Sequence, residues 1–377
     1  MKKVYADNSA TSFPKAPGVS DAIKDFLDNV GCNVNRGGYE SSYSVALEIL
    51  AARKLLCEMF GFSEPRNVVF TPSVTYSLNM ILQGFLSAGD HVVTTSMEHN
   101  GVMRPLHELS KIGVAYDAAQ CGHDGTLDVR NLATLINGKT KAVVMTHASN
   151  VCGTVLPLRE VWEICSGRGI KLIVDAAQTA GVLDIDMAYV DALAFTCHKG
   201  LLASQGLGGF VIKGEMAQHV RPVITGGTGS LSHGITQPDF LPDKFESGTM
   251  NIPAIIGLKK SLEYIKSEGI SPKKKMFLTN LFLQLLEEIP EVTIIGRKAN
   301  RTAVISLNFT TIDNAQAAAA LANDYGIMTR CGLHCSPAAH KTLNTYPCGT
   351  VRFSFGCFNT PEEIKYIAES IKKIVRF

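Results

Sequence analysis

The sequence has little net charge, few cysteines for its length and no long apolar run. Lysine and arginine total 36 against 34 aspartate and glutamate, so the formal charge is +2. Such a near-balance gives no electrostatic reason to expect nucleic acid or a membrane surface as a partner. Ten cysteines in 377 residues are too few for a disulfide framework. We find no stretch of about 18 apolar residues that could span a bilayer.

The start of the sequence also lacks the apolar segment of a signal peptide, because Met1-Lys2-Lys3 is followed at once by VYADNSATS. We therefore expect a cytoplasmic protein with mostly reduced cysteines. What the chain does have is 46% hydrophobic residues, enough to bury a large core. Its length suggests two domains, or one large domain with an appendage.

The middle of the chain alternates short apolar runs with amphipathic helical segments. Continuous β-branched runs between helices predict an α/β fold with a mostly parallel sheet covered on both faces. The expected strands are 68–71, 91–94, 114–117, 141–146, 171–175, 192–196 and 209–212. The expected helices are 44–60, 77–86, 102–111, 129–136 and 158–167.

From residue 253 on, helices and strands mix at shorter spacing, which predicts a smaller α+β domain. Helices are expected over 254–267, 274–288, 315–325 and 361–375, and strands over 292–295, 304–308, 327–330 and 350–354. We therefore assign residues 13–252 to a large domain, and residues 1–12 with 253–377 to a small one. The lysine run 273–275 is expected to be a solvated turn.

Two charged residues follow neighbouring strands of the large domain, at the edge where ligands bind in open α/β sheets. Asp175 ends one strand, although a lone aspartate there could instead be a helix N-cap. Lys199 follows the next strand, and a buried lysine there could form a Schiff base, although a lone loop lysine is more often solvated. Together the two match a pyridine cofactor, whose ring nitrogen needs a carboxylate and whose aldehyde needs an amine.

Three further strand ends offer polar groups to the same pocket. Ser73, Val74 and Thr75 open a helix that could bind a phosphate. His99 could stack on a planar ring, and Asn150 offers an amide to a phenolic oxygen. Polar features at the ends of five successive strands indicate one site.

With these residues the sequence resembles the class V aminotransferases, specifically their cysteine desulfurase and selenocysteine lyase branch. The resemblance covers nearly the whole chain. It is carried by Asn150, by Asp175 with Gln178, and by Thr196, His198 and Lys199. Residues 5–12 also resemble the family's D-N-A-A-T opening, 33–37 its N-x-H-R-G stretch, Glu98-His99 its E-H motif, and 245–251 its F-E-x-G-T-x-N segment.

The resemblance implies a homodimeric, fold-type-I pyridoxal-phosphate enzyme with a mostly parallel, seven-stranded sheet. It implies that Lys199 forms the Schiff base and that His99 stacks on the ring and helps proton transfer. The other implied cofactor-binding residues are Asp175, Gln178, Asn150, Ser73, Val74, Thr75, Thr196, His198 and, from a neighbouring subunit, Thr249. The sequence also departs from the family. It has Ser73-Val74-Thr75 in place of the usual G-T-T, its residues 199–206 do not follow the common K-x-x-G-P-x-G, and Asn35 and Tyr39 replace frequent histidines.

The resemblance also implies how an amino-acid substrate binds. Arg352, Asn150 and Asn8 would contact it, because an α-carboxylate calls for a bidentate guanidinium. Without the resemblance, Arg352 could instead be an arginine paired on an edge strand.

Near the carboxyl end, Cys331, His334 and Cys335 lie within five residues of one another. They could belong to a zinc site, but their spacing fits no usual finger pattern and we expect no metal. Further ligands would have to come from Cys348, Cys357 or His340. Both cysteines could also be purely structural. The stretch resembles the family's R-x-G-x-H-C-x-P loop, which implies that Cys335 takes sulfur from the substrate.

We therefore expect a pyridoxal-phosphate enzyme that converts L-cysteine to L-alanine and leaves the sulfur on Cys335 as a persulfide, with Lys199 as the base at Cα. The alternatives are a selenocysteine lyase, another class V aminotransferase or β-lyase, and a non-catalytic sulfur-handling partner. The short cysteine loop is similar to that of the type II branch, which implies that an acceptor protein receives the sulfur.

Overall fold

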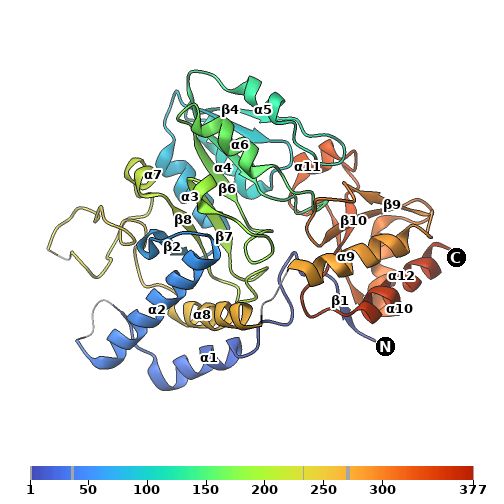
Figure 1. Ribbon diagram of the computed structural model, residues 1–377, viewed down its shortest axis with the longest axis horizontal. Helices are drawn as coiled ribbons and strands as arrows, with labels where there is room; N and C mark the ends of the chain where they lie inside the picture. Colours follow the sequence, from blue (N-terminus) through green and yellow to red (C-terminus); the bar gives the residue numbers. More distant parts are fainter. Residues whose placement is uncertain (1, 35–37, 232, 269–271, 377) are drawn as a thin grey trace.

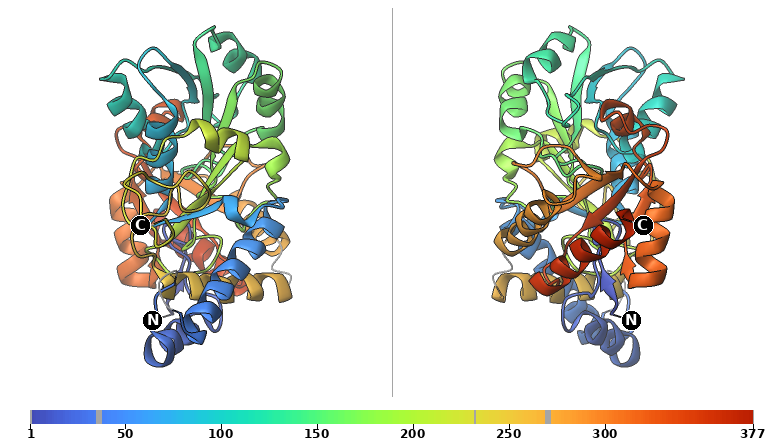
Figure 2. Two further views of the ribbon diagram at one scale, coloured as in Figure 1. Left: turned by 90° about the vertical axis from the view of Figure 1, so that its left-hand side faces the viewer. Right: turned by 90° about the vertical axis from the view of Figure 1, so that its right-hand side faces the viewer.

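The computed structural model describes residues 2–34, 38–231, 233–268 and 272–376. Residues 35–37, which complete the N-x-H-R-G resemblance, lie outside this part of the chain. Figure 1 shows a large sheet flanked by helices and, beside it, a smaller group of strands and helices that holds both chain ends. The orange and red helices of the smaller group face the viewer in the right-hand view of Figure 2.

The large sheet has the strand order β2-β8-β7-β6-β5-β3-β4. Its strands are β2 (Val68–Thr71), β3 (His91–Thr95), β4 (Ala115–Ala119), β5 (Thr140–Thr146), β6 (Lys171–Asp175), β7 (Ala192–Thr196) and β8 (Gly208–Ile212). Only β8 runs antiparallel, to β2 on one side and to β7 on the other. The prediction of a mostly parallel, seven-stranded sheet is therefore confirmed.

Successive residues of the inner strands point into two different cores. Val143 and Leu172 belong to the core on one face of the sheet, and Val144 and Ile173 belong to the core on the other face. This burial on both sides explains why the strands are continuous apolar runs rather than alternating ones. The helices of this region are α1 (Val19–Asp25), α2 (Glu40–Met59), α3 (Val74–Phe85), α4 (Asn100–Ser110), α5 (Val129–Leu135), α6 (Leu158–Ser166), α7 (Gly214–His219) and α8 (Ile252–Ser267).

The smaller region is built on an antiparallel sheet of order β12-β13-β10-β9. Its strands are β9 (Val292–Ile295), β10 (Val304–Phe309), β12 (Arg330–Gly332) and β13 (Thr350–Ser354), and its helices are α9 (Pro272–Leu286), α10 (Asn314–Tyr325), α11 (Pro337–Thr342) and α12 (Pro361–Val375). Strand β1 (Val4–Tyr5) pairs with β11 (Ile327–Met328), which attaches the first residues to this region. The expected single strand 327–330 is therefore wrong, since the chain leaves β11 and enters a second sheet at β12.

Helix α8 packs on α1 and α2, and its Ile255, Leu258 and Leu262 belong to a core of the large sheet. The domain division at residue 252 stays a prediction. The expected solvated turn at 273–275 is wrong, because α9 already begins at Pro272 and turns Lys275 inward. No helix in the described ranges is long and apolar enough to cross a membrane.

Candidate active site

The carboxyl ends of β6 and β7 place Asp175 and Lys199 in one site. Asp175 is the last residue of β6, is buried, and accepts a hydrogen bond at Oδ1 from the backbone N–H of Ala177 at 2.8 Å. Lys199 follows the end of β7 and lines a cavity. Each charge acts on the other group's ionisation. The two residues that the sequence singles out as a pair are thus brought together.

Burial decides the protonation behaviour of this pair. Removal of its amine from water lowers the pKa of Lys199 to about 8, although the Asp175 carboxylate opposes the shift. Burial likewise raises the pKa of Asp175, against the stabilising effects of the Ala177 N–H and of Lys199. At neutral pH, Lys199 holds a larger fraction of neutral, nucleophilic amine than an ordinary lysine does.

His99 stands at the start of α4, where its Nδ1 accepts a hydrogen bond from the backbone N–H of Gly101 at 2.9 Å. That bond leaves the proton of the neutral ring on Nε2. Burial, followed by the positive charges of Lys199 and of nearby arginines, lowers the pKa of His99 to about 4. The ring is therefore neutral at pH 7. Thr75 lies at the same corner, since a Cβ at Gly101 would be 3.9 Å from its Oγ1.

The first turn of α3 forms an anion-binding surface. Ser73 caps the helix by accepting a hydrogen bond from the N–H of Tyr76 at 3.4 Å. Strand β8 passes so close that a Cβ at Gly208 would lie 2.8 Å from the nitrogen of Val74. The free N–H groups and dipole of a helix start favour negative charge, and the hydroxyls of Ser73 and Thr75 add hydrogen-bond donors.

Thr196 and His198 continue this surface at the end of β7. Thr196 is buried, and the Nδ1 atom of His198 is buried without a hydrogen-bond partner among the described residues. Burial, together with Lys199 and Lys15, lowers the pKa of His198 to about 4. A buried ring nitrogen without a partner in the protein is typical of a position that a ligand completes.

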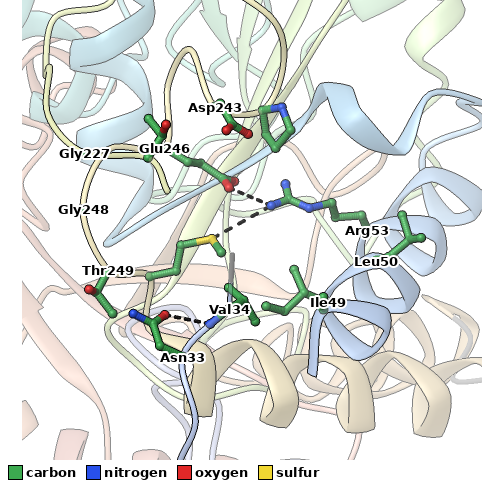
Figure 3. Close-up of a pocket in the computed structure, with 14 residues that line it drawn as sticks. Asn33, Val34, Ile49, Leu50, Arg53, Gly227, Asp243, Glu246, Gly248 and Thr249 are labelled. Atoms are coloured by element: carbon green, nitrogen blue, oxygen red, sulfur yellow. Dashed lines mark hydrogen bonds and ion pairs between the residues drawn. The ribbon is translucent and has the colours of Figure 1, made fainter. Parts of the chain in front are cut away.

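Thr249 lies apart from Lys199 within the chain. It lines a pocket with Arg53 and Glu246, whose side chains form an ion pair at 2.7 Å (Figure 3). An adjoining pocket places Thr249 beside Pro72 and Tyr76, next to the start of α3. Neither pocket is lined by Lys199, Asp175 or His99.

Asn8 and Gln178 line one cavity together with Lys199. Gln178 donates a hydrogen bond from Nε2 to the backbone oxygen of Ser9 at 3.3 Å. Asn8 donates from Nδ2 to the backbone oxygen of Ser354 at 3.1 Å. The first contact links Gln178 to the opening segment of the chain, and the second links that segment to β13.

Arg352 is a fully buried arginine on β13. Its Nη2 pairs with Oδ1 of Asp7 at 2.8 Å, and its Nη1 donates to the backbone oxygen of Asn150 at 3.1 Å. The side chain of Asn150 turns to the cysteine loop: its Oδ1 accepts from the Ser336 hydroxyl at 2.7 Å, and its Nδ2 donates to the backbone oxygen of His334 at 2.8 Å.

Cys335 is exposed at the tip of this loop. His334 and Cys335 both adopt left-handed backbone conformations, with φ of 49° and 59°, which non-glycine residues rarely occupy. The N–H of Asn100 donates to the Cys335 oxygen at 2.9 Å, and the Sγ atom lies 3.9 Å from Nη2 of Arg330. Cys335 lines the same pocket as Thr75 and His99.

A zinc site at the cysteine loop, an alternative interpretation of the sequence, would require a cluster of ligands. Among the described residues, no three histidine, cysteine, aspartate or glutamate side chains gather so that they could hold a metal ion. All ten cysteines are free thiols, and Cys348 is exposed rather than buried.

Sequence reasoning gave no individual role to four residues of the site, although three of them are named positions of the quoted motifs. Asp7 lies in the opening segment, and Arg330 is the arginine of the loop motif. Nothing in the sequence around Ser336 points to a role for this residue.

Glu98 precedes His99 in the E-H motif and is fully buried. Its Oε1 accepts hydrogen bonds from the Thr95 hydroxyl at 2.6 Å and from the Thr146 N–H at 2.9 Å. Burial raises the pKa of Glu98 to about 8.

The sheet order, the lysine and carboxylate at its carboxyl edge, and the antiparallel second region define a fold-type-I α/β architecture. The family model described as Aminotransferase class-V matches residues 4–367, and the chain belongs to this family. Both the fold class and the family that the sequence predicted are therefore confirmed.

Individual proteins agree with this assignment. A "Probable cysteine desulfurase" from Synechocystis sp. is 30% identical over 99% of this chain and 91% of its own length. A "Cysteine desulfurase" from Escherichia coli O157:H7 is 30% identical over 99% of this chain and 93% of its own. The apo structure of a cysteine desulfurase from Thermococcus onnurineus NA1 superposes with a TM-score of 0.91 at 29% identity, over 99% of this chain and 95% of that one.

Proposed function

We propose that this protein is a pyridoxal-phosphate-dependent cysteine desulfurase that converts L-cysteine to L-alanine and retains the sulfur as a persulfide on Cys335. The observation that carries the proposal is the position of Cys335, which lines one pocket with His99 and Thr75. Lys199 acts electrostatically on that same histidine. A thiol at such a site supports sulfur transfer. A transaminase, by contrast, would need no cysteine there. The names of the relatives support the same activity.

The residues of the site fit pyridoxal phosphate. Lys199 would hold it through its amine, and Asp175 would pair with the ring nitrogen. The neutral ring of His99 is suited to stack on a planar cofactor. The groups that suit its phosphate are Ser73, Val74, Thr75, Thr196 and His198, whose Nδ1 lacks a partner among the described residues. When bound, the cofactor withdraws electrons from the substrate's Cα, which makes the Cα proton acidic and weakens the Cβ–sulfur bond.

The chain's own residues would then do the following work. Arg352 binds the α-carboxylate, with Asn8 and Asn150 beside it. Lys199 removes the proton from Cα, a role that suits an amine whose pKa is near 8. Arg352 and Asn150 are buried, and removal from water strengthens their electrostatic contacts.

The sulfur transfer is balanced in atoms and electrons. The Cβ–sulfur bond of L-cysteine breaks while a sulfur–sulfur bond forms at Sγ of Cys335. L-cysteine and one thiol become L-alanine and one persulfide, so the exchange needs no external oxidant. Arg330, 3.9 Å from Sγ, places a positive charge beside the attacking sulfur.

We also propose a cytoplasmic homodimer, in which Thr249 reaches the phosphate site of the neighbouring subunit. Thr249 is exposed and lies away from Lys199 in its own chain. Tyr43 and Leu47 of α2, together with Ile224, expose large apolar side chains that a second subunit would cover. The exposed thiol of Cys335 suits delivery of sulfur to an acceptor protein.

The test is incubation of the cofactor-loaded protein with L-cysteine and a thiol reductant. We expect L-alanine and sulfide in equal amounts, and neither product from Lys199→Ala. Formation of neither product by the wild-type protein would refute the proposal. Pyruvate in place of alanine would point to a β-lyase instead.

A further inference from the structure

Asp7 is an internal carboxylate on the arginine expected to bind the substrate's carboxylate. Its Oδ1 lies 2.8 Å from Nη2 of Arg352. The arginine side chain is 2% exposed and the aspartate side chain 19% exposed. A buried guanidinium without a counter-charge is strongly unfavourable, so Asp7 supplies the neutralising charge. Any other carboxylate that binds Arg352 must share it with Asp7 or displace it.

The pair leaves part of the guanidinium unused. Arginine and carboxylate commonly form two parallel hydrogen bonds, but Asp7 accepts one, from Nη2. The Nε atom of Arg352 is buried and has no partner within the described part of the chain. Burial lowers the pKa of Arg352, and Asp7 opposes that shift. The contact with Asp7 therefore neutralises the charge of the Arg352 guanidinium but leaves one of its N–H donors unused.

The backbone of Asp7 is held by hydrogen bonds, whereas its side chain is partly exposed to solvent. The backbone oxygen of Asp7 accepts hydrogen bonds from the N–H of Ala10 at 3.0 Å and from the Tyr5 hydroxyl at 3.2 Å. The side chain, by contrast, is partly exposed and lies at the edge of the site. A rotation about its χ angles would bring the carboxylate to solvent without any change in the chain path.

We propose that Asp7 occupies the substrate's α-carboxylate subsite until substrate arrives, and that the incoming carboxylate displaces it from Arg352. This inference rests on the proposed function for the role of Arg352. Two carboxylates on one buried guanidinium repel each other, and the partly exposed Asp7 is the one that can regain water. Asp7 is thus a specificity-determining residue: only a ligand that carries its own carboxylate can replace the internal one.

The exchange also reaches the nucleophile loop. Arg352 holds the backbone oxygen of Asn150 through Nη1, and the Asn150 amide holds the residues on both sides of Cys335. A substrate whose carboxylate takes the place of Asp7 on Arg352 therefore keeps the contacts from Arg352 through Asn150 to the cysteine loop. A ligand without a carboxylate leaves Asp7 where it is.

The test measures ligand binding to the cofactor-loaded protein by calorimetry, with L-alanine and L-alaninamide as probes. The two probes differ only in that L-alaninamide carries a neutral amide in place of the carboxylate of L-alanine. Asp7→Asn removes the competing charge, so we expect it to bind L-alanine about tenfold more tightly than the wild-type protein does, with no comparable gain for L-alaninamide. Asp7→Glu, which keeps the charge, should bind L-alanine as the wild type does. The matched control is Asp21→Asn, at an exposed position of α1, which should change neither affinity.

The inference is overturned if Asp7→Asn binds L-alanine equally or more weakly, or if no variant binds L-alanine at all. It is also overturned if L-alaninamide gains as much as L-alanine. None of these readings depends on turnover. A failure of the proposed function, which is the absence of alanine formation from L-cysteine, is therefore observed separately.

Discussion

Ser336 donates a hydrogen bond to Oδ1 of Asn150 at 2.7 Å, which joins the cysteine loop to the turn that follows β5. The same amide donates to the His334 oxygen at 2.8 Å. Asn150 therefore holds the residues immediately before and after Cys335. Because Arg352 in turn holds the Asn150 backbone, the position of the nucleophile depends on the substrate-binding side of the site.

Removal of the Ser336 hydroxyl should slow sulfur transfer without changing cofactor binding. In Ser336→Ala, the loop loses one of its two bonds to Asn150, and misplacement of a nucleophile commonly reduces a rate by about 10- to 100-fold. Alanine formation from L-cysteine measures the rate, and the absorbance spectrum of the bound cofactor serves as the control. Ser336→Thr keeps the hydroxyl and should restore much of the rate. Full activity of Ser336→Ala would show that the bond does not position Cys335.

Cys335 should be required for turnover, and Cys348 should not. Both thiols are exposed, so replacement by alanine leaves no core cavity and should change the free energy of unfolding by less than about 0.5 kcal/mol. We expect Cys335→Ala to lose at least about 100-fold in alanine formation, since Cys335 supplies the thiol of the described pocket that His99 and Thr75 line. Cys348→Ala is the matched control, with wild-type rates expected. An equal loss of alanine formation in both variants would show that Cys335 is not the sulfur-accepting thiol.

The buried carboxyl of Glu98 should make stability fall as the pH rises. Burial raises its pKa from 4.5 to about 8, so the folded chain holds a proton that the unfolded chain releases. The stabilisation is complete below pH 4.5 and is lost as the pH rises through 8. Its slope approaches ~1.4 kcal/mol per pH unit.

Glu98→Gln, which keeps an acceptor for Thr95 and Thr146, should flatten this part of the stability curve. Urea unfolding at several pH values measures the effect. A wild-type curve parallel to that of Glu98→Gln between about pH 5 and 8 would contradict the assignment.

Lys275 should destabilise the chain at neutral pH. It is 5% exposed and lines the cavity that Lys199 also lines, so its amine is charged in a largely desolvated position. Burial lowers its pKa, although the charge of Cys357 opposes the shift. Lys275→Met removes the buried charge and should stabilise the protein by about 1 to 3 kcal/mol.

The pH dependence of this gain has a definite sign. Below the unfolded pKa of 10.5 the unfolded chain binds the proton more readily, so wild-type stability rises as the pH approaches that value. The advantage of Lys275→Met should therefore shrink at high pH. Lys274→Met, at an exposed neighbour, is the control and should change stability by less than about 0.5 kcal/mol. A destabilised Lys275→Met would show that the amine has a stabilising partner.

The sequence predicts local features of the structure more reliably than contacts between distant segments. The bounds of β2, β6 and β7 are as expected, because each is a continuous apolar run buried on both faces. Asp175 and Lys199 are found from the sequence because parallel strands bring their carboxyl ends to one edge. The contacts Asp7–Arg352 and Asn150–Ser336 join segments far apart in the chain, and no local pattern encodes them. The burial of Lys275 is not apparent from the sequence, because its lysine neighbours suggest a solvated turn.

The most direct test of the central claim is a single turnover of the cofactor-loaded protein with L-cysteine and no reductant, followed by mass spectrometry of its peptides. We predict one added sulfur atom on the Cys335 peptide for each L-alanine released. L-alanine released at the wild-type rate by Cys335→Ala, or added sulfur on a different cysteine, would contradict the account.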